Sequence, residues 1–334
     1  MYEAYYHLRD KPFQLNPDPR FFYGSRGHKR AFSYLEYGLS LGEGFIIITG
    51  DVGAGKTMLV KHLLKKLERG NYLAANLVST QLDADDMLRS VSAAFGLDYE
   101  HLSKAALLNN LQTFLRDTLR QGRRALLIVD EAQNLSPKAV EELRMLSNFQ
   151  EGEKSLLQSF LLGQPEFRDT LQSPEMQQLR QRVIASYHLG PMDRDETMGY
   201  ILHRLKTVGW HGNPAFAEDA FDAIHAFSGG VPRRINTLCD RLLLFGFLEE
   251  RNQFDAKAVQ EVIADLRQEV HYQGPPVKQT QMSAVAATPV SMAAAAALPA
   301  DLEERLTQIE RGLTRLIPMV RKILYSVSEG QERD

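Results

Sequence analysis

Short runs of consecutive apolar residues recur in the first part of the chain, and each run predicts a β-strand buried on both faces. Such strands are typical of parallel sheets, which helices cover on both sides. Helical patterns separate several of the runs, including one over 105–119 and one that ends at Phe95, for which Asp83 is the expected N-cap. The alternation predicts an α/β fold with a parallel central sheet. The apolar runs lie at 45–48, 72–78, 125–129, 156–162 and 184–189.

After residue 190 the apolar residues follow helical spacing alone, without a signal for a strand. We therefore expect a compact α-helical module in this part of the chain. The expected helices span 193–208, 218–227, 231–249 and 256–266.

A glycine-rich loop joins the first predicted strand to a helix within residues 43–60, EGFIIITGDVGAGKTMLV. Glycines let successive backbone N–H groups turn toward one anion, and the new helix adds its positive end. Strand, loop and helix occur in the order that a phosphate-binding loop requires, so a chance glycine turn is a poor explanation. Lys56 is expected to reach the β- and γ-phosphates and Thr57 to hold Mg²⁺. The residues expected to contact the nucleotide are Gly50, Asp51, Val52, Gly53, Ala54, Gly55, Lys56, Thr57 and Met58.

A second buried strand, 125–129, ends in two carboxylates, Asp130 and Glu131. Ligands of open α/β sheets bind at the carboxyl ends of the strands. There Asp130 can hold Mg²⁺ through water, and Glu131 can orient or deprotonate an attacking water. The alternative is that the two acids only begin the next helix, whose N-cap is expected at Ser136, with Pro137 at the first helical position.

Gln164 follows the run 156–162 and so lies at another strand end, next to the expected γ-phosphate. This placement predicts a polar sensor of hydrolysis, although the side chain could instead cap the turn.

Three arginines are candidates for contact with phosphate. Arg180 and Arg182 lie in a short helix that leads into the strand-like run at 184–189. Arg233 follows Gly229–Pro232 at the start of a helix, where a cation opposes the helix dipole. A bound phosphate would supply the negative charge that this position lacks.

The two ends of the chain differ from the rest. Three prolines interrupt residues 1–25, which could pack beneath a nucleotide base or simply clasp the core. Residues 271–300 are rich in proline, alanine and small polar residues, which predicts a disordered linker. Residues 301–328 show a heptad seam interrupted by Pro318, and this predicts an interaction helix whose partner is either a second copy or another protein.

Composition narrows the class of protein. The chain has 334 residues, a formal net charge of −3 and one cysteine, Cys239, so no intrachain disulfide can form. The negative charge gives no overall attraction to nucleic acid or anionic lipid. The N-terminus lacks the plan of a signal peptide, and no apolar run is long enough to span a bilayer.

The loop, the strand that ends in Asp-Glu, the polar strand end, the arginines and the helical module together resemble the AAA+ ATPases. More narrowly, three strings are similar to the ExeA-like (general secretion pathway protein A) branch, and most of all to the ATPases associated with exosortase/PEP-CTERM and exopolysaccharide gene systems. The strings are KPFQLNPDPRFFYGS at 11–25, VDEAQNLS at 129–136 and LLGQPEF at 161–167. The resemblance covers about residues 1–270.

The resemblance implies a role for each candidate. Lys56 and Thr57 would form the Walker A motif, and Asp130 and Glu131 the Walker B pair. Gln164 would be the first sensor, although this sensor is more often Asn, Thr or Ser, and Arg233 the second. Arg180 or Arg182 would be the finger that reaches a neighbouring subunit, which implies a homo-oligomer, commonly a ring.

These expectations combine into one hypothesis and two alternatives. We expect a cytoplasmic, Mg²⁺-dependent ATPase that drives conformational work in envelope export or exopolysaccharide assembly, peripheral to the inner membrane at most, with a protein partner on the C-terminal helix. Secretion-type relatives continue into a membrane span and a peptidoglycan-binding domain that are absent here, which favours a soluble form. The alternatives are a DNA-associated ATPase of the transposition-helper or initiator-loader type and a nucleotide-binding scaffold that hardly hydrolyses its nucleotide.

The expected domains of the chain are an α/β nucleotide-binding domain with an N-terminal clasp at 1–190, a helical lid at 191–270, the linker at 271–300 and the interaction helix at 301–328.

Overall fold

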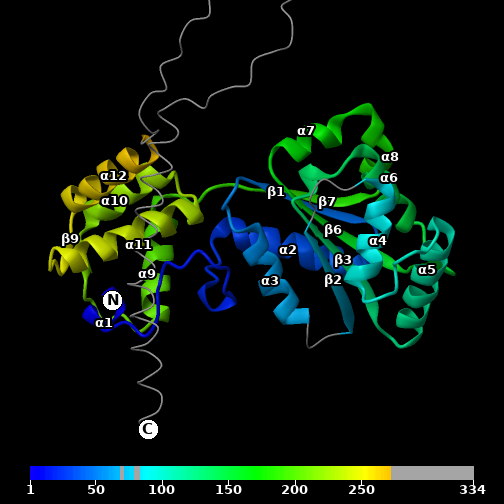
Figure 1. Cartoon of the computed structure of the whole chain (residues 1–334), viewed down its shortest axis with the longest axis horizontal. Coiled ribbons are helices and arrows are strands. Elements are labelled where there is room, and N and C mark those ends of the chain that lie inside the picture. Colours follow the sequence, from blue (N-terminus) through cyan, green and yellow to red (C-terminus); the bar gives the residue numbers. More distant parts are fainter. Residues whose placement is uncertain (68–70, 79–82, 272–334) are drawn as a thin grey trace, which may run out of the picture. The chain divides into compact units, whose positions relative to one another are not determined.

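The computed structural model describes residues 1–67, 71–78 and 83–271. A five-stranded parallel sheet forms its first part, with strand order β2-β3-β6-β1-β7 (Figure 1). The expected parallel α/β sheet is thus confirmed. The strands are β1 (Phe45–Gly50), β2 (Tyr72–Val78), β3 (Arg124–Asp130), β6 (Leu157–Gly163) and β7 (Val183–Leu189).

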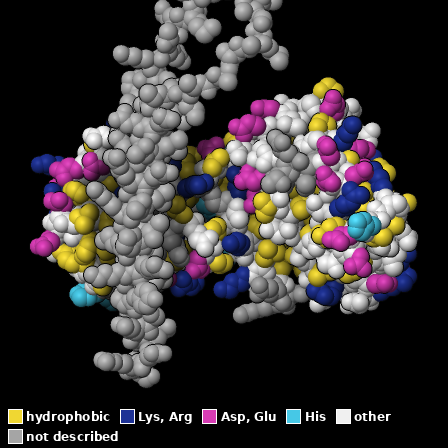
Figure 2. All heavy atoms as spheres, in the orientation of Figure 1, with side chains coloured by type: hydrophobic (Ala, Val, Ile, Leu, Met, Phe, Trp, Pro, Cys, Tyr) yellow, Lys and Arg dark blue, Asp and Glu magenta, His cyan; other side chains and the backbone are white. Residues whose placement is uncertain are grey.

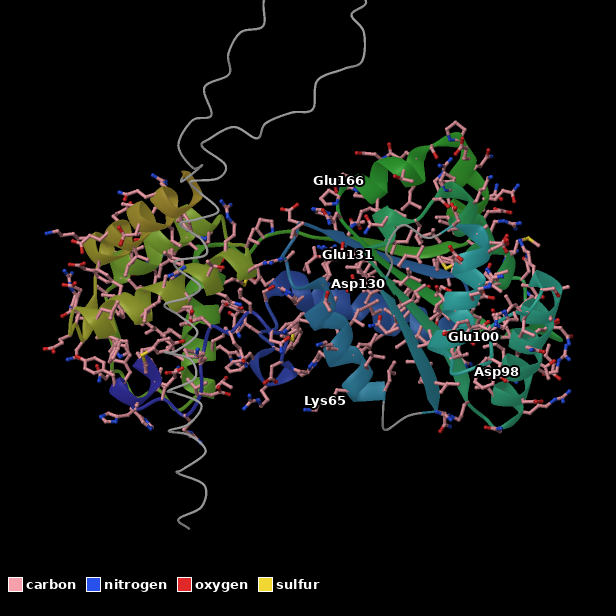
Figure 3. All side chains as sticks on the ribbon, viewed as in Figure 1. Lys65, Asp98, Glu100, Asp130, Glu131 and Glu166 are labelled. Atoms are coloured by element: carbon pink, nitrogen blue, oxygen red, sulfur yellow. The ribbon has the colours of Figure 1, made fainter. Side chains whose placement is uncertain are left out.

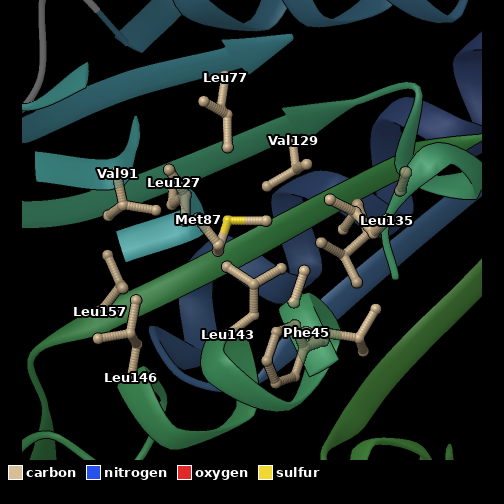
Figure 4. Packing of buried hydrophobic residues seen from close by; sticks show 14 of the residues in the cluster. Phe45, Leu77, Met87, Val91, Leu127, Val129, Leu135, Leu143, Leu146 and Leu157 are labelled. Carbon is tan, nitrogen blue, oxygen red and sulfur yellow. The ribbon is translucent and has the colours of Figure 1, made fainter. Parts of the chain in front are cut away.

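Alternate side chains of each inner strand enter two different hydrophobic cores, because successive residues of a strand point to opposite faces. Ile46 and Ile48 of β1 pack with helices α2 and α3, whereas Phe45 and Ile47 belong to the core formed with α4, α5 and α6. Figure 4 shows part of this second core, in which side chains of α4 and α6 lie against β3. Burial on both faces is the physical reason that these strands read as unbroken apolar runs.

The helices around the sheet begin and end at the local signals of the sequence. Ser136 accepts a hydrogen bond from the Ala139 N–H and so caps α6, as expected. Asp83 occupies the N-cap position of α4, but its side chain makes no capping hydrogen bond. The helices of this part are α2 (Arg26–Leu41), α3 (Lys56–Leu67), α4 (Ala84–Ala94), α5 (Lys104–Arg120), α6 (Pro137–Leu146), α7 (Glu166–Gln172) and α8 (Gln177–Arg180). Shorter elements are the 3₁₀ turns η2 (Ala132–Asn134) and η3 (Pro174–Met176) and the strand pair β4 (Gln150–Glu151) and β5 (Lys154–Ser155).

Beyond β7 the described chain is mainly helical, as expected. The helices are α9 (Arg194–Thr207), α10 (Glu218–Ser228), α11 (Pro232–Leu248) and α12 (Ala256–His271). The expectation of no strand here is wrong in one detail, since β8 (Ala215–Phe216) pairs with β9 (Gln253–Phe254) in parallel. Two-residue strands of this kind are too short to produce a period-2 pattern in the sequence.

Most buried aromatic residues of the N-terminal segment pack with this helical part. Tyr2, Tyr6, Phe13 and Phe21 are almost fully buried in a core shared with α9–α12. The segment contains α1 (Tyr2–Tyr5) and the 3₁₀ turn η1 (Pro19–Phe21). The clasp that we expected within the 1–190 domain thus holds the helical module.

All the described residues belong to one contact unit. The expected linker (271–300) and interaction helix (301–328) lie outside the described residues, apart from the end of α12. No helix in the described part of the chain is long and apolar enough to cross a membrane.

Candidate nucleotide-binding site

The glycine-rich loop connects the end of β1 to the start of α3, as the sequence predicts. Gly53 and Gly55 have φ angles of +83° and +100°, which residues with a side chain rarely adopt. A Cβ on Gly55 would lie 2.7 Å from His28 Nε2, and one on Gly53 would lie 2.4 Å from Arg233 Cβ. The loop therefore requires glycine at both positions for conformation and for space.

Lys56 lies at the first position of α3 with only 6% of its surface exposed. Its Nζ donates hydrogen bonds to the carbonyl oxygens of Gly50 at 2.6 Å and Asp51 at 3.1 Å. Burial lowers the pKa of Lys56, against the opposing effect of the nearby carboxylates, of which Glu131 acts most strongly. The amine is thus held against the loop where a phosphate chain would lie.

Thr57 and Asp130 meet where α3 begins and β3 ends. The Thr57 hydroxyl donates to Asp130 Oδ2 at 2.8 Å, and the Glu131 N–H donates to Asp130 Oδ1 at 3.0 Å. Within the described chain, no three His, Cys, Asp or Glu side chains form a ready-made metal site. A hydroxyl paired with one carboxylate fits Mg²⁺, which usually takes few protein ligands and completes its shell with water and substrate phosphates.

The Glu131 side chain belongs to a network of amides. Its Oε2 accepts hydrogen bonds from Gln133 Nε2 at 2.6 Å and from Gln164 Nε2 at 3.2 Å. Burial acts to raise the pKa of Glu131, but these two bonds and the charge of Lys56 outweigh it, so that the pKa is lowered. The carboxylate is therefore ionised, as a group that orients water must be. Figure 3 labels Asp130 and Glu131 at this end of β3.

The start of α11 lies against the loop. The Arg233 N–H donates to the Gly53 carbonyl at 3.2 Å. A cavity of about 330 Å³ is lined by both Arg233 and the loop. Arg233 thus lies at a helix N-terminus facing the loop, the place expected from the sequence.

The opposite wall of this cavity was not predicted in detail. Leu15, Pro17, Phe21 and Phe22 line it, and Phe21 is at the same time buried with Phe13 in the helical core. The N-terminal segment therefore packs in the helical core and also lines the cavity. His28, Tyr200, Arg204 and Asn236 also line the cavity and were missed.

Arg204 holds this wall together although it is only 3% exposed. Its guanidinium donates to the carbonyl oxygens of Pro12 at 2.5 Å and Gln14 at 3.2 Å and to the Tyr200 hydroxyl at 2.7 Å. It also lies 4.6 Å from the ring centroid of Phe21. A signal existed in the sequence, because Arg204 interrupts the apolar face of α9 between Ile201 and Leu205.

His28 connects α2 to the loop. Ser25 Oγ lies 2.7 Å from His28 Nδ1, and the other ring nitrogen bonds the Ala54 carbonyl. Burial lowers the pKa of His28, so the ring is neutral near pH 7. No sequence motif marks this residue, since its role depends on a contact that the fold creates.

Arg180 and Arg182 do not line this cavity. Arg180 bonds the carbonyl oxygens of Leu171 and Ser173, where the Ser173 distance is 2.7 Å. Arg182 bonds the Ser147 hydroxyl at 2.8 Å and the Asn148 side chain. Both lie before β7, at the sheet end opposite the loop, which is compatible only with a role toward a neighbouring molecule or within the fold.

The structure thus places most of the predicted residues around one cavity. Asp130 joins the site through Thr57, and Gln164 joins it through Glu131. The predicted residues that line the cavity directly are Val52, Gly53, Gly55, Lys56, Thr57, Met58, Glu131 and Arg233.

Comparison with known proteins defines the class. Residues 40–171 match the family described as AAA domain. The fold is similar to that of the ORC2 protein of Aeropyrum pernix, with a TM-score of 0.61 and 16% identity over 77% of this chain and 72% of that chain. It is also similar to Cdc6p of Pyrobaculum aerophilum, with a TM-score of 0.60 and 15% identity over 77% of this chain and 71% of that chain. The chain has the P-loop AAA fold.

One relative is similar to this chain in sequence. The chain is 38% identical over 248 residues to general secretion pathway protein A of Aeromonas hydrophila. The match covers 74% of this chain and 45% of that protein, so the chain spans less than half the length of this relative. The sequence similarity to this relative thus concerns 248 residues, and the family match within this chain is the AAA domain.

Proposed function

We propose that this protein binds ATP with Mg²⁺ and hydrolyses it to ADP and phosphate. The observation that supports this most is the Thr57–Asp130 contact beside a buried Lys56 and an ionised Glu131. Four groups from two segments, the start of α3 and the end of β3, thus meet at one loop, each of the type that phosphoryl transfer requires.

In this proposal each side chain has one task. Lys56 and the loop N–H groups bind the β- and γ-phosphates. Thr57 and Asp130 hold Mg²⁺, which when bound neutralises charge on the phosphate oxygens. Glu131 orients the water that attacks the γ-phosphorus and accepts its proton as the bond to the ADP oxygen breaks. Gln164 and Arg233 contact the γ-phosphate as the two sensors.

We also propose that the active form is a homo-oligomer in which Arg180 or Arg182 reaches the nucleotide of a neighbour. The support is indirect: neither side chain lines the cavity of its own chain, and both lie on one segment before β7. Arginine suits this task because its planar fork stays charged and stabilises the transferring phosphoryl group.

The biological task that we propose is conformational work in envelope export or exopolysaccharide assembly, at the cytoplasmic side of the inner membrane and through a protein partner. The secretion-pathway relative supports envelope export. The three strings quoted from the sequence support exopolysaccharide assembly in an exosortase-associated system. A DNA-associated role has weaker support. The likeness to initiator proteins concerns the fold alone, and side chains of both signs are interspersed on the face in Figure 2.

Turnover and binding of ATP by purified variants test the catalytic proposal. We expect Lys56→Ala to lose ATP binding, whereas Glu131→Gln should keep binding and lose turnover by about 10²–10⁴-fold. Lys65→Ala, an exposed change on the same helix (Figure 3), is the matched control and should behave as the wild type. Wild-type turnover by the Glu131→Gln variant would contradict the proposed role of this residue.

A series of protein concentrations tests the oligomer. If a neighbour completes the site, specific activity should rise with concentration together with the mass measured by light scattering. Constant activity from a monomer would contradict the finger in trans.

A further inference from the structure

Gln133 is the residue through which two strand ends are connected. It lies in η2, directly after β3, and its side-chain amide forms two hydrogen bonds. Nε2 donates to Glu131 Oε2 at 2.6 Å, and Oε1 accepts from the Gln164 N–H at 2.9 Å. The end of β3 is thereby joined to the end of β6 by one side chain.

An amide can form both bonds at once because it carries a donor and an acceptor on one planar group. One bond needs a donor facing a carboxylate and the other needs an acceptor facing a backbone N–H. A carboxylate at position 133 would keep the acceptor but would repel Glu131. An apolar side chain of the same length would lose both bonds.

Glu131 needs such support because its backbone is unusual. Its φ angle is +56°, in the left-handed region that residues other than glycine rarely adopt. A residue stays in this region only where the surrounding structure holds it. Gln133 provides the shorter of the two side-chain hydrogen bonds to Glu131, 2.6 Å against 3.2 Å from Gln164.

We propose that Gln133 is a positioning residue that fixes the Glu131 carboxylate and ties it to Gln164. The inference rests on the proposed function of Glu131 and deepens it. In the proposed cycle Gln164 turns its amide to the γ-phosphate and gives up its bond to Glu131. Gln133 then remains as the partner that keeps the carboxylate in place, so its loss should slow the chemical step and spare nucleotide binding.

Substitutions at position 133 test this separation. Gln133→Met should lower kcat by about 10- to 100-fold, since a small misplacement of a catalytic group has effects of this size. The KM and the Kd for ATP should stay within about twofold of the wild type. Gln133→Glu should lose at least as much activity, and Gln260→Met, an exposed change on α12, should lose none. A merely structural role would instead lower affinity and stability together.

A chemical shift that needs no turnover provides the second readout. The ¹³C signal of the Glu131 carboxyl can be identified in NMR spectra as the peak that Glu131→Gln removes. We expect this signal to move in Gln133→Met at constant pH, because the carboxylate loses the 2.6 Å hydrogen bond from Gln133. It should stay in place in Gln260→Met.

The two readouts separate the failures. If wild-type protein hydrolyses ATP, Glu131→Gln does not, and Gln133→Met matches the wild type, the inference is overturned and the proposed function stands. If the wild type shows no turnover, the proposed hydrolysis fails and the chemical shift decides on Gln133. An unchanged Glu131 carboxyl signal in Gln133→Met would overturn the inference on its own.

Discussion

The two walls of the cavity are built in opposite ways. The wall that would bind phosphate comes from a continuous segment, in which Lys56 bonds the carbonyl of Gly50 only six residues earlier. The facing wall depends on contacts between distant segments, as in the bond from Arg204 to the Pro12 carbonyl 192 residues earlier. One wall is therefore a property of local sequence, and the other is a property of the folded chain.

This difference indicates how the site divides its tasks. Phosphate is the same in every nucleotide, so a short loop with fixed backbone angles is sufficient to bind it. The facing wall combines aromatic rings, an amide and a buried cation, and it joins the N-terminal segment to α9. Any movement of the helices therefore carries Pro12 and Gln14 with it, because Arg204 bonds both carbonyls.

The largest effect that we expect comes from the position where the two parts touch, Gly53. An alanine there would have to adopt a φ angle of +83° and would bring its Cβ within 2.4 Å of Arg233 Cβ. We expect Gly53→Ala to reduce ATP affinity by about 100-fold or more, or about 2.7 kcal/mol. Isothermal titration calorimetry measures this directly.

Gly96→Ala is the matched control for this change. Gly96 has a φ angle of +75°, but a Cβ there would meet nothing within 4 Å. This variant should lose about 1–2 kcal/mol of stability from backbone strain and keep its affinity for ATP. Equal affinities in the two variants would show that the contact between Gly53 and Arg233 is irrelevant to binding.

The same contrast explains what the sequence could predict. The strands, the loop, Asp130 and Glu131 were predictable because their signals lie within a few residues and depend on burial period and turn chemistry. Tyr200 and Asn236 were not, because their place depends on which segment packs opposite α9 and α11. For Arg204 the sequence signals burial on α9 but not which groups it bonds. Gln133 lies within the string VDEAQNLS, but the sequence does not single it out. Its two hydrogen bonds arise only when β3 and β6 are aligned.

Replacement of Arg204 should have the next largest effect, and mainly on stability. Arg204→Met leaves two backbone carbonyls and the Tyr200 hydroxyl without their donor, while relief of the buried charge offsets part of this loss. We expect the free energy of unfolding to fall by about 2–4 kcal/mol in urea denaturation followed by circular dichroism. Arg204→Lys should recover little, because an ammonium lacks the planar fork that reaches all three acceptors.

Arg89→Met controls for the loss of an arginine as such. Arg89 is 43% exposed and pairs with Asp86 one turn away on α4. Such exposed pairs contribute about 0.2–1 kcal/mol. If both variants lost the same small amount, Arg204 would not hold the facing wall together.

The smallest expected effect concerns pH and the contact between His28 and the loop. Burial holds the pKa of His28 below its ordinary value of 6.5, against the opposing charge of Glu196. As pH falls through that ordinary value, His28 becomes protonated in the unfolded chain but stays neutral in the folded protein. The free energy of unfolding therefore decreases on acidification. Burial lowers the pKa of His62 and His203 as well, so the wild type should show a combined effect.

His28→Gln keeps a donor for the Ala54 carbonyl but cannot titrate, and its stability should fall less between about pH 8 and about pH 5.5. Urea denaturation at both pH values measures the difference, with His211→Gln, a change at an exposed histidine, as the control. The same pH dependence in His28→Gln and the wild type would mean that the His28 ring protonates without disturbing its contact with the loop.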